Sequence, residues 1–230
     1  MNTEILTDED LFMQNYDKMP EERKKKIDRF KFHKDQRLSL GAGILLKKGL
    51  DDLGLEDEKI AYSKNGKPFI QDKSDVFFNI SHSESMAVCA FSDRPVGVDI
   101  EKSVDFDELM VTQIFNSGEV KQSLSKYKDK SAGYTFLWTV KESFVKYLGI
   151  GLELSPKNIC VDIGSEICVS CKGIDCANLH FYTIETGNYV LTVCSEYESF
   201  TDRVEWINKF SCRKRGSWSW RRKPCVRYIL

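Results

Sequence analysis

The feature that most constrains this fold is the spacing of apolar residues, which changes along the chain from a spacing typical of helices to one typical of strands. Residues 20–50 carry apolar side chains at roughly helical spacing, and Pro20 suits the start of a helix or helix pair. Three short β-rich runs follow, bounded by polar residues or glycine, at residues 76–80, 86–91 and 96–101. Because these runs follow one another so closely, the sequence predicts an antiparallel meander.

A second series of helices and strands follows. Residues 107–115 and 131–148 return to helical spacing, and Gly149 suits a C-terminal cap. Four further runs alternate apolar with polar residues, as a second half-buried sheet would: 158–163, 166–171, 179–184 and 189–195. Residues 188–195 also faintly echo residues 85–92. We therefore predict an α+β fold built from two related halves.

Charge separates the last residues from the rest. Residues 206–230 contain eight basic residues and no acid, so this tail is +8, the remaining 205 residues are −9 and the chain is −1. We predict an N-terminal half at residues 1–102, a C-terminal half at 103–205 and a basic tail at 206–230. The tail is typical of a solvated extension, although with its tryptophans it could also bind nucleic acid or an acidic partner. The acidic body disfavours nucleic acid.

Composition points to the cytoplasm. No run of residues reaches membrane-spanning length, and the first residues are acidic where a secretory signal would be basic. The eight cysteines are accordingly interpreted as reduced thiols. Cys168, Cys171 and Cys176 have one CxxC spacing, which allows zinc, but such thiols near strands are more often small buried hydrophobes.

The most informative stretch is PVGVDIE, residues 95–101. On a strand, Asp99 and Glu101 project from the same face while Val98 and Ile100 face the core. Two neighbouring carboxylates repel each other, and Mg²⁺, which prefers oxygen ligands and phosphates, could offset that repulsion. For an isolated D-x-E, an exposed strand end in water is the simpler interpretation.

Two other stretches carry polar groups that could act with this pair. In WTVKESFVK, Glu142 and Lys146 stand one helical turn apart, which by itself predicts only an ordinary surface ion pair. In FNISHS, Ser81 and His82 could donate hydrogen bonds to phosphate, although neighbours on a strand face opposite sides and do not suit a nucleophile pair. No Walker loop or GxGxxG fingerprint occurs.

Taken in order, these stretches resemble the Sfp-type 4′-phosphopantetheinyl transferases. The resemblance covers residues 20–195 and rests on five motifs in family order: Gly66-Lys67-Pro68, FNISHS at 78–83, VGVDIE at 96–101, the F-x-x-x-E element Phe115 to Glu119, and WTVKESFVK followed by GIGL. It implies a monomer of two similar α+β halves related by a pseudo-twofold axis, with coenzyme A in the cleft between them. Such enzymes move the phosphopantetheine arm of coenzyme A onto a carrier-protein serine and release adenosine 3′,5′-bisphosphate.

The resemblance also implies roles for individual residues. Asp99, Glu101 and Glu142 would bind Mg²⁺, with Lys146 neutralising charge on the diphosphate. Ser81 and His82 would touch the phosphates, and Gly66, Lys67 and Pro68 would line the adenine and phosphate side of the pocket. The 3′-phosphate would meet Arg37 and one or more basic residues of the first helix region, among them Arg23 and Lys26. Glu142, directly or through water, would remove the serine proton, with Asp99 and Lys146 completing the catalytic set.

The sequence also contains a weaker signal for a surface that could contact a carrier protein. Lys121, Lys126, Lys128 and Lys130 flank Val120, Leu124 and Tyr127, which would suit an acidic amphipathic carrier helix, or equally a solvated loop. Chain length favours a transferase for peptide or polyketide carriers of secondary metabolism over the dedicated fatty-acid type, whose chains are about half as long. Two functions of other classes remain possible: a catalytically silent binding module for coenzyme A or carrier proteins, and nucleic-acid binding through the tail.

Overall fold

The computed structural model describes residues 1–198, 200–205 and 226–229. Most of the predicted basic tail, and with it the possible nucleic-acid contact, lies outside the described residues. None of the described helices is long and apolar enough to cross a membrane.

The first half of the chain packs helices against a strand hairpin. Its elements are η1 (Thr3–Thr7), α1 (Glu9–Tyr16), α2 (Glu21–Asp28), α3 (His33–Leu53), β1 (Ile60–Tyr62), β2 (Pro68–Ile70), β3 (Phe77–Ser83) and β4 (Met86–Ser92). The helix pair predicted within residues 20–50 is confirmed as α2 and α3. Leu40 and Leu45 of α3 are fully buried against Phe78 and Phe91 of the hairpin. Gly54 ends α3 in the left-handed conformation, at φ 70°.

The second half begins with a strand, which helices and then further strands follow. Its elements are β5 (Val96–Lys102), α4 (Glu108–Ile114), α5 (Ser117–Lys126), α6 (Lys130–Leu148), η2 (Gly151–Glu153), η3 (Pro156–Asn158), β6 (Ile159–Ile163), β7 (Ile167–Cys171), β8 (His180–Thr186) and β9 (Tyr189–Ser195). Two strands come last, β10 (Phe200–Glu205) and β11 (Val226–Ile229). The helices and strands predicted here are confirmed, whereas the sequence pattern does not predict α1 and α5.

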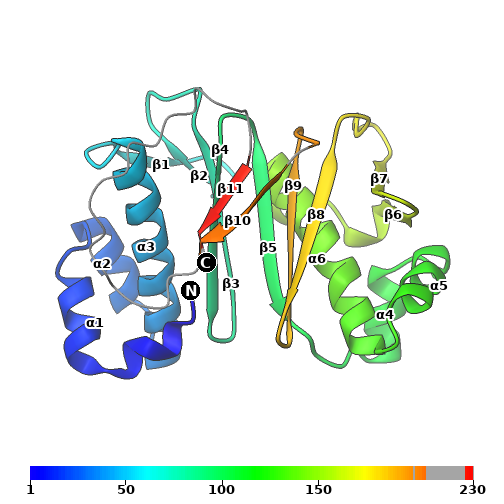
Figure 1. The fold of residues 1–230 in the computed structure, drawn as a ribbon, viewed down its shortest axis with the longest axis horizontal. Coiled ribbons are helices and arrows are strands. Elements are labelled where there is room, and N and C mark those ends of the chain that lie inside the picture. Colours follow the sequence, from blue (N-terminus) through cyan, green and yellow to red (C-terminus); the bar gives the residue numbers. More distant parts are fainter. Residues whose placement is uncertain (199, 206–225, 230) are drawn as a thin grey trace.

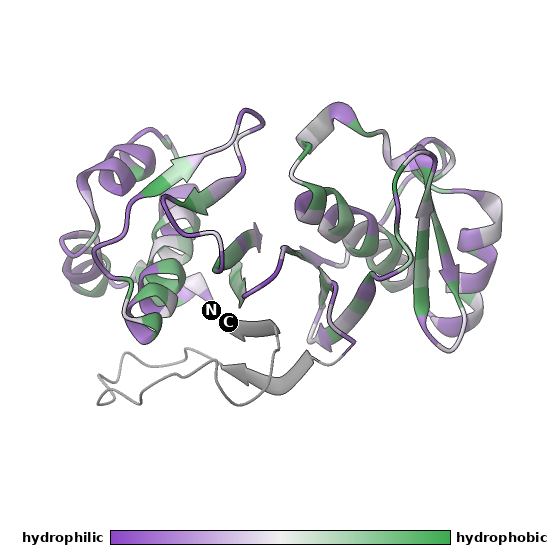
Figure 2. Ribbon diagram, turned by 90° about the horizontal axis from the view of Figure 1, so that it is seen from above, coloured by the Kyte–Doolittle hydropathy of each residue, from purple (hydrophilic) through white to green (hydrophobic). Residues whose placement is uncertain are grey.

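The strands of the two larger sheets form a central layer between the two groups of helices (Figure 1). In Figure 1, α1 to α3 lie at one end of the molecule and α4 to α6 at the other, and Figure 2 shows the same division at right angles. The larger sheets run β10-β11-β4-β3 and β5-β9-β8, and two small hairpins pair β1 with β2 and β6 with β7. The α+β class is therefore confirmed, but the second set of four strands does not form one sheet, because β6 and β7 pair only with each other.

The predicted meander is wrong at its third strand. β3 and β4 pair antiparallel, but β5 pairs with β9 and lies beside β3 without a backbone ladder between them. Side chains of β3 take the place of that ladder. Asn79 Oδ1 accepts from the backbone N–H of Val98 at 2.9 Å, and the hydroxyls of Ser81 and Ser83 accept from the next two alternate residues of β5. The two sheets therefore meet along a seam made of polar side chains.

The open edge of β4 is covered by segments far away in sequence. Asn2 forms a bridge with Met86, and β11 pairs antiparallel with residues 89–91. Residues 226–229 of the predicted tail thus belong to the sheet of the first half.

Helix α6 packs directly onto β5, and Gly97 permits this close approach. A Cβ atom at Gly97 would overlap the carbonyl oxygen of Ser143 and the backbone of Tyr147. Because backbone cannot move aside as a flexible side chain can, we expect Gly97→Ala to lower the free energy of unfolding by about 3 kcal/mol. Urea unfolding measures this. Gly118→Ala in α5, where an added Cβ meets open space, is the matched control and should change stability little; an equal loss in both variants would contradict the packing argument.

Candidate active site

At the centre of the seam, three side chains from three elements form one hydrogen-bonded cluster. Asp99 on β5 is buried, and its Oδ1 accepts from Ser81 Oγ of β3 at 2.8 Å and from Lys146 Nζ of α6 at 2.5 Å. Lys146 Nζ also donates to Ser81 Oγ at 2.8 Å. Ser81 is therefore oriented toward the seam, where it joins residues of both halves.

One oxygen of this cluster has no partner. Asp99 Oδ2 is buried and accepts no hydrogen bond within the described part of the chain. A buried carboxylate oxygen without a donor is costly, so its presence points to a ligand that supplies positive charge or a proton. Two residues further along β5, Glu101 Oε2 accepts from Ser83 Oγ at 2.6 Å.

Glu142 of α6 faces the same region. Burial raises the pKa of Glu142, and the negative charges of Asp99 and Glu101 add to the rise. Burial likewise raises the pKa of Glu101, with Asp99 contributing. The three acids thus influence one another electrostatically, although no three His, Cys, Asp or Glu side chains among the described residues form a complete metal-binding group. The three carboxylates concentrate negative charge in one region, and a bound cation would relieve the repulsion between them.

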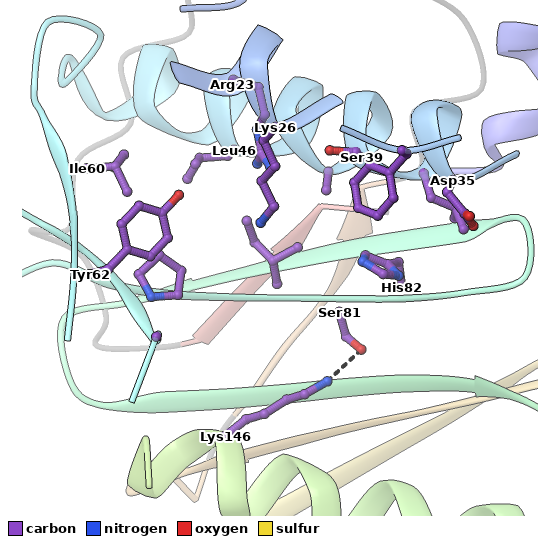
Figure 3. A pocket seen from close by; sticks show the side chains of 16 residues that line it. Arg23, Lys26, Asp35, Ser39, Leu46, Ile60, Tyr62, Ser81, His82 and Lys146 are labelled. Carbon is purple, nitrogen blue, oxygen red and sulfur yellow. Dashed lines mark hydrogen bonds between the residues drawn. The ribbon is translucent and has the colours of Figure 1, made fainter. Parts of the chain in front are cut away.

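Beside this cluster lies a cavity of about 270 Å³ between α2, α3, the β1–β2 turn and β3. Figure 3 shows Arg23 and Lys26 reaching into it from α2, opposite Ser81, His82 and Lys146. Neither Arg23 nor Lys26 has an ion-pair partner among the residues that the structure describes. Loss of solvent lowers the pKa of Lys26, and the charge of Arg23 lowers it further. Two unpaired cations held together in a cavity favour an anionic ligand.

The remaining wall of this cavity is partly apolar. Tyr62, Gly66 and Pro68 line the β1–β2 side, and Ser39 of α3 lines the opposite side with a buried hydroxyl that has no partner among the described residues. Arg37 does not line the cavity, because the residues of α3 that do so, 35, 38, 39, 42 and 46, lie on a different face of that helix. The structure therefore does not bring Arg37 to the other predicted phosphate contacts.

A second cavity of about 380 Å³ shares Lys146 with the first as a lining residue. Trp138, Glu142 and Lys146 of α6 line it, together with Gly66, Lys67 and Pro68. The ammonium of Lys67, however, donates to three backbone carbonyls of the second half. The rest of Lys67 forms part of the wall of this cavity, beside Gly66 and Pro68.

The predicted carrier surface and thiol cluster have other surroundings. Val120 and Tyr127 pack against the core of the second half, whereas Leu124 is half-buried and the four lysines around them are exposed. Cys168 is exposed, while Cys171 and Cys176 pack against the same core. Zinc at these thiols has no support, because no metal-binding group of side chains forms within residues 1–198, 200–205 and 226–229.

Sequence reasoning missed several residues of the site. Ser39 and Tyr62 line the first cavity, and Asn79 lines the second. Only Ser39 had a usable signal, since it shares a helical face with the apolar residues 38, 42 and 46. The others depend on contacts between segments far apart in sequence.

Comparison with known proteins identifies the family. The model of the 4′-phosphopantetheinyl transferase superfamily matches residues 95–194, and that of the N-terminal region of a 4′-phosphopantetheinyl transferase matches residues 7–94. The 4′-phosphopantetheinyl transferase Sfp of Bacillus subtilis is 30% identical over 194 residues, covering 81% of this chain and 86% of that protein. The transferase gsp of Aneurinibacillus migulanus is 34% identical over 174 residues, covering 74% of this chain and 73% of that protein.

Among solved structures, the holo-[acyl-carrier-protein] synthase of Helicobacter pylori, in complex with coenzyme A, aligns with 43% of this chain and 96% of that one, at 17% identity and a TM-score of 0.36. The two family models together span residues 7–194, and the chain therefore belongs to the Sfp-type 4′-phosphopantetheinyl transferases.

Proposed function

We propose that this enzyme, acting as a monomer, uses Mg²⁺ to transfer 4′-phosphopantetheine from coenzyme A to a carrier-protein serine, releasing adenosine 3′,5′-bisphosphate. The observation that carries the proposal is the position of Asp99. Its buried Oδ2 has no partner among the described residues, and the charges of Asp99 and Glu101 act on Glu142. Ser81 and Lys146, which bond to the other oxygen of Asp99, line a cavity that also holds Arg23 and Lys26. A diphosphate with a divalent ion would satisfy both needs at once, because the acids would hold the ion and Arg23 and Lys26 would hold phosphate charge.

The donor set suits Mg²⁺ rather than a metal enclosed by protein. Mg²⁺ is usually bound by one or two carboxylates, with water and substrate phosphates completing its octahedron. Asp99 Oδ2 accepts no hydrogen bond from the residues that the structure describes, and Glu101 and Glu142 offer further oxygens near it. These oxygens are fewer than an octahedron needs, which leaves room for the diphosphate as a ligand. When bound, Mg²⁺ would neutralise and orient the diphosphate.

The reaction then depends on positions that α6 controls. Glu142 has a pKa raised by burial, so it is suited to accept the proton of the carrier serine, directly or through water. Lys146, which bonds to Asp99 and Ser81, is placed to meet the charge that develops on the leaving phosphate. The serine oxygen forms the new bond to the β-phosphorus, and the bond from that phosphorus to the bridging oxygen breaks.

The first cavity suits the nucleotide end of coenzyme A. Tyr62 and Pro68 offer a flat apolar wall for adenine, and Arg23 and Lys26 offer charge for the 3′-phosphate. The Ser39 hydroxyl, which has no partner within the described ranges, could donate one further hydrogen bond. His82 lines the same space beside Lys146.

Binding of 3′-dephospho-coenzyme A tests this assignment. We expect Lys26→Met to reduce the preference for coenzyme A over its dephospho form by about tenfold, because one charge-assisted contact with the 3′-phosphate is lost. Titration calorimetry with both ligands measures the ratio. Lys25→Met, one residue away on the exposed face of α2, is the control and should keep the wild-type ratio. An unchanged ratio in Lys26→Met would remove Lys26 from the 3′-phosphate site.

The activity itself is tested by intact-mass spectrometry of a carrier domain incubated with enzyme, coenzyme A and Mg²⁺. We expect the carrier to gain the mass of one phosphopantetheine, and the gain to disappear with a chelator and return with added Mg²⁺. Binding of coenzyme A without any mass gain on a panel of carriers would instead support the silent binding module.

A further inference from the structure

Lys67 connects the two halves of the molecule through its ammonium group. It lies in the turn between β1 and β2, in the first half, and its Nζ donates to the carbonyl oxygens of Lys146 at 2.6 Å, Tyr147 at 3.0 Å and Val96 at 3.2 Å. Lys146 and Tyr147 belong to the last turn of α6, and Val96 begins β5. One side chain therefore joins the first half to both elements that carry the acids.

The end of α6 needs such a partner. The last carbonyls of a helix have no partner within the helix, and their partial negative charge favours a cation. The N–H of Gly149 satisfies the carbonyl of Val145, and Lys67 satisfies the next two. A Cβ at Gly149 would lie 2.9 Å from Lys67 Cδ, so glycine gives the lysine stem room. Asn65, from the same turn, donates to the carbonyl of Ile150 at 3.2 Å.

The capped turn belongs to the helix that does the chemistry. Glu142 stands one turn before Lys146, and the two cavities meet at Lys146. Gly66 and Pro68, on either side of Lys67, line both cavities. Movement of this turn relative to α6 would therefore change the distance between the nucleotide wall and the reacting groups.

We propose that Lys67 is a positioning residue, a helix cap supplied across the seam that fixes α6, and with it Glu142 and Lys146, at the correct distance from bound coenzyme A. This rests on the proposed function. An ammonium has three N–H donors, and three carbonyls occupy those of Lys67, so none is left for a phosphate oxygen. Its contribution is therefore to the rate of transfer rather than to the affinity for coenzyme A.

Three variants separate positioning from direct phosphate binding. Lys67→Met removes the cap, Lys67→Arg keeps a cation that can donate to carbonyls, and Lys64→Met changes an exposed lysine of the same turn as a matched control. For each full-length variant we would measure the Kd for coenzyme A by calorimetry with Mg²⁺, kcat at saturating coenzyme A and carrier, and amide hydrogen exchange over residues 143–151.

For Lys67→Met we expect kcat to fall by about tenfold to a hundredfold, because catalysis is sensitive to displacements near 1 Å. The Kd for coenzyme A should change by less than about threefold, and exchange at the end of α6 should accelerate. Lys67→Arg should recover part of kcat and of the protection, and Lys64→Met should match wild type. Weaker coenzyme A binding by about tenfold, with kcat and exchange unchanged, would overturn the proposal and make Lys67 a phosphate ligand.

Two further outcomes would also support or overturn the proposed role of Lys67. If Lys67→Met does not fold, Lys67→Arg carries the test: wild-type exchange and kcat combined with weaker binding would overturn the proposal, and lower kcat with wild-type binding would support it. If wild-type enzyme transfers nothing, the proposed function fails, and exchange and coenzyme A binding alone judge whether Lys67 caps α6.

Discussion

Replacing Glu142 by glutamine is expected to lower kcat for phosphopantetheine transfer by about 10³-fold while the protein remains folded. The substitution preserves size but removes the negative charge and the ability to accept the serine proton. Because the carboxylate of Glu142 is already crowded by Asp99 and Glu101, its loss relieves repulsion in the free protein. We therefore expect the thermal unfolding temperature to stay constant or rise slightly.

Intact-mass time courses at saturating coenzyme A and Mg²⁺ measure the rate, and circular dichroism measures unfolding. Glu166→Gln, at an exposed position in the turn between β6 and β7, is the matched control and should retain wild-type activity. A Glu142→Gln enzyme within about tenfold of wild type would show that neither proton transfer nor metal binding depends on this residue.

The second large effect concerns stability. Glu119 at the start of α5 and Lys141 of α6 form a buried ion pair at 2.5 Å, with both side chains almost fully excluded from solvent. Glu119 also accepts the backbone N–H of Asn116 and of Val161. We expect Glu119→Gln to lower the free energy of unfolding by about 4 kcal/mol, because it leaves the ammonium of Lys141 buried without a counter-charge.

Urea unfolding of the two single variants and the double variant tests this as a thermodynamic cycle. The double variant Glu119→Gln/Lys141→Met should be clearly more stable than the sum of the two single losses predicts, since it leaves no unpaired charge. Strictly additive losses, or a loss below about 1 kcal/mol in Glu119→Gln, would contradict the argument.

The Glu119 pair also changes how the sequence motifs are interpreted. In the sequence, the Phe115 to Glu119 element stands among motifs that carry chemistry. In the structure, Glu119 caps α5 and anchors it to β6 and α6, and Phe115 is buried beside it. A sequence motif shared by a family can therefore reflect a shared hydrophobic core as well as a shared active site. The burial of its side chains and the identity of their bonding partners distinguish these two cases.

Features that depend on local period could be predicted from the order of residues alone. The strand period of two places Asp99 and Glu101 on one face of β5, and the helical period places Glu142 and Lys146 on one face of α6. Turn and cap residues such as Gly149 fix where those elements end. These features need only neighbouring residues, so a single sequence contains them.

Which elements meet, in contrast, depended on the packing of the whole chain. The pairing of β5 with β9 rather than β4, the bond from Lys146 across the seam to Ser81, and the Lys67 cap on α6 all join residues separated by 65 or more positions. Such contacts depend on which strand edges and helix ends still lack hydrogen-bond partners once the halves have packed. These partners are set by the packing of the whole molecule, because an unsatisfied backbone group bonds to whichever partner the folded chain places next to it.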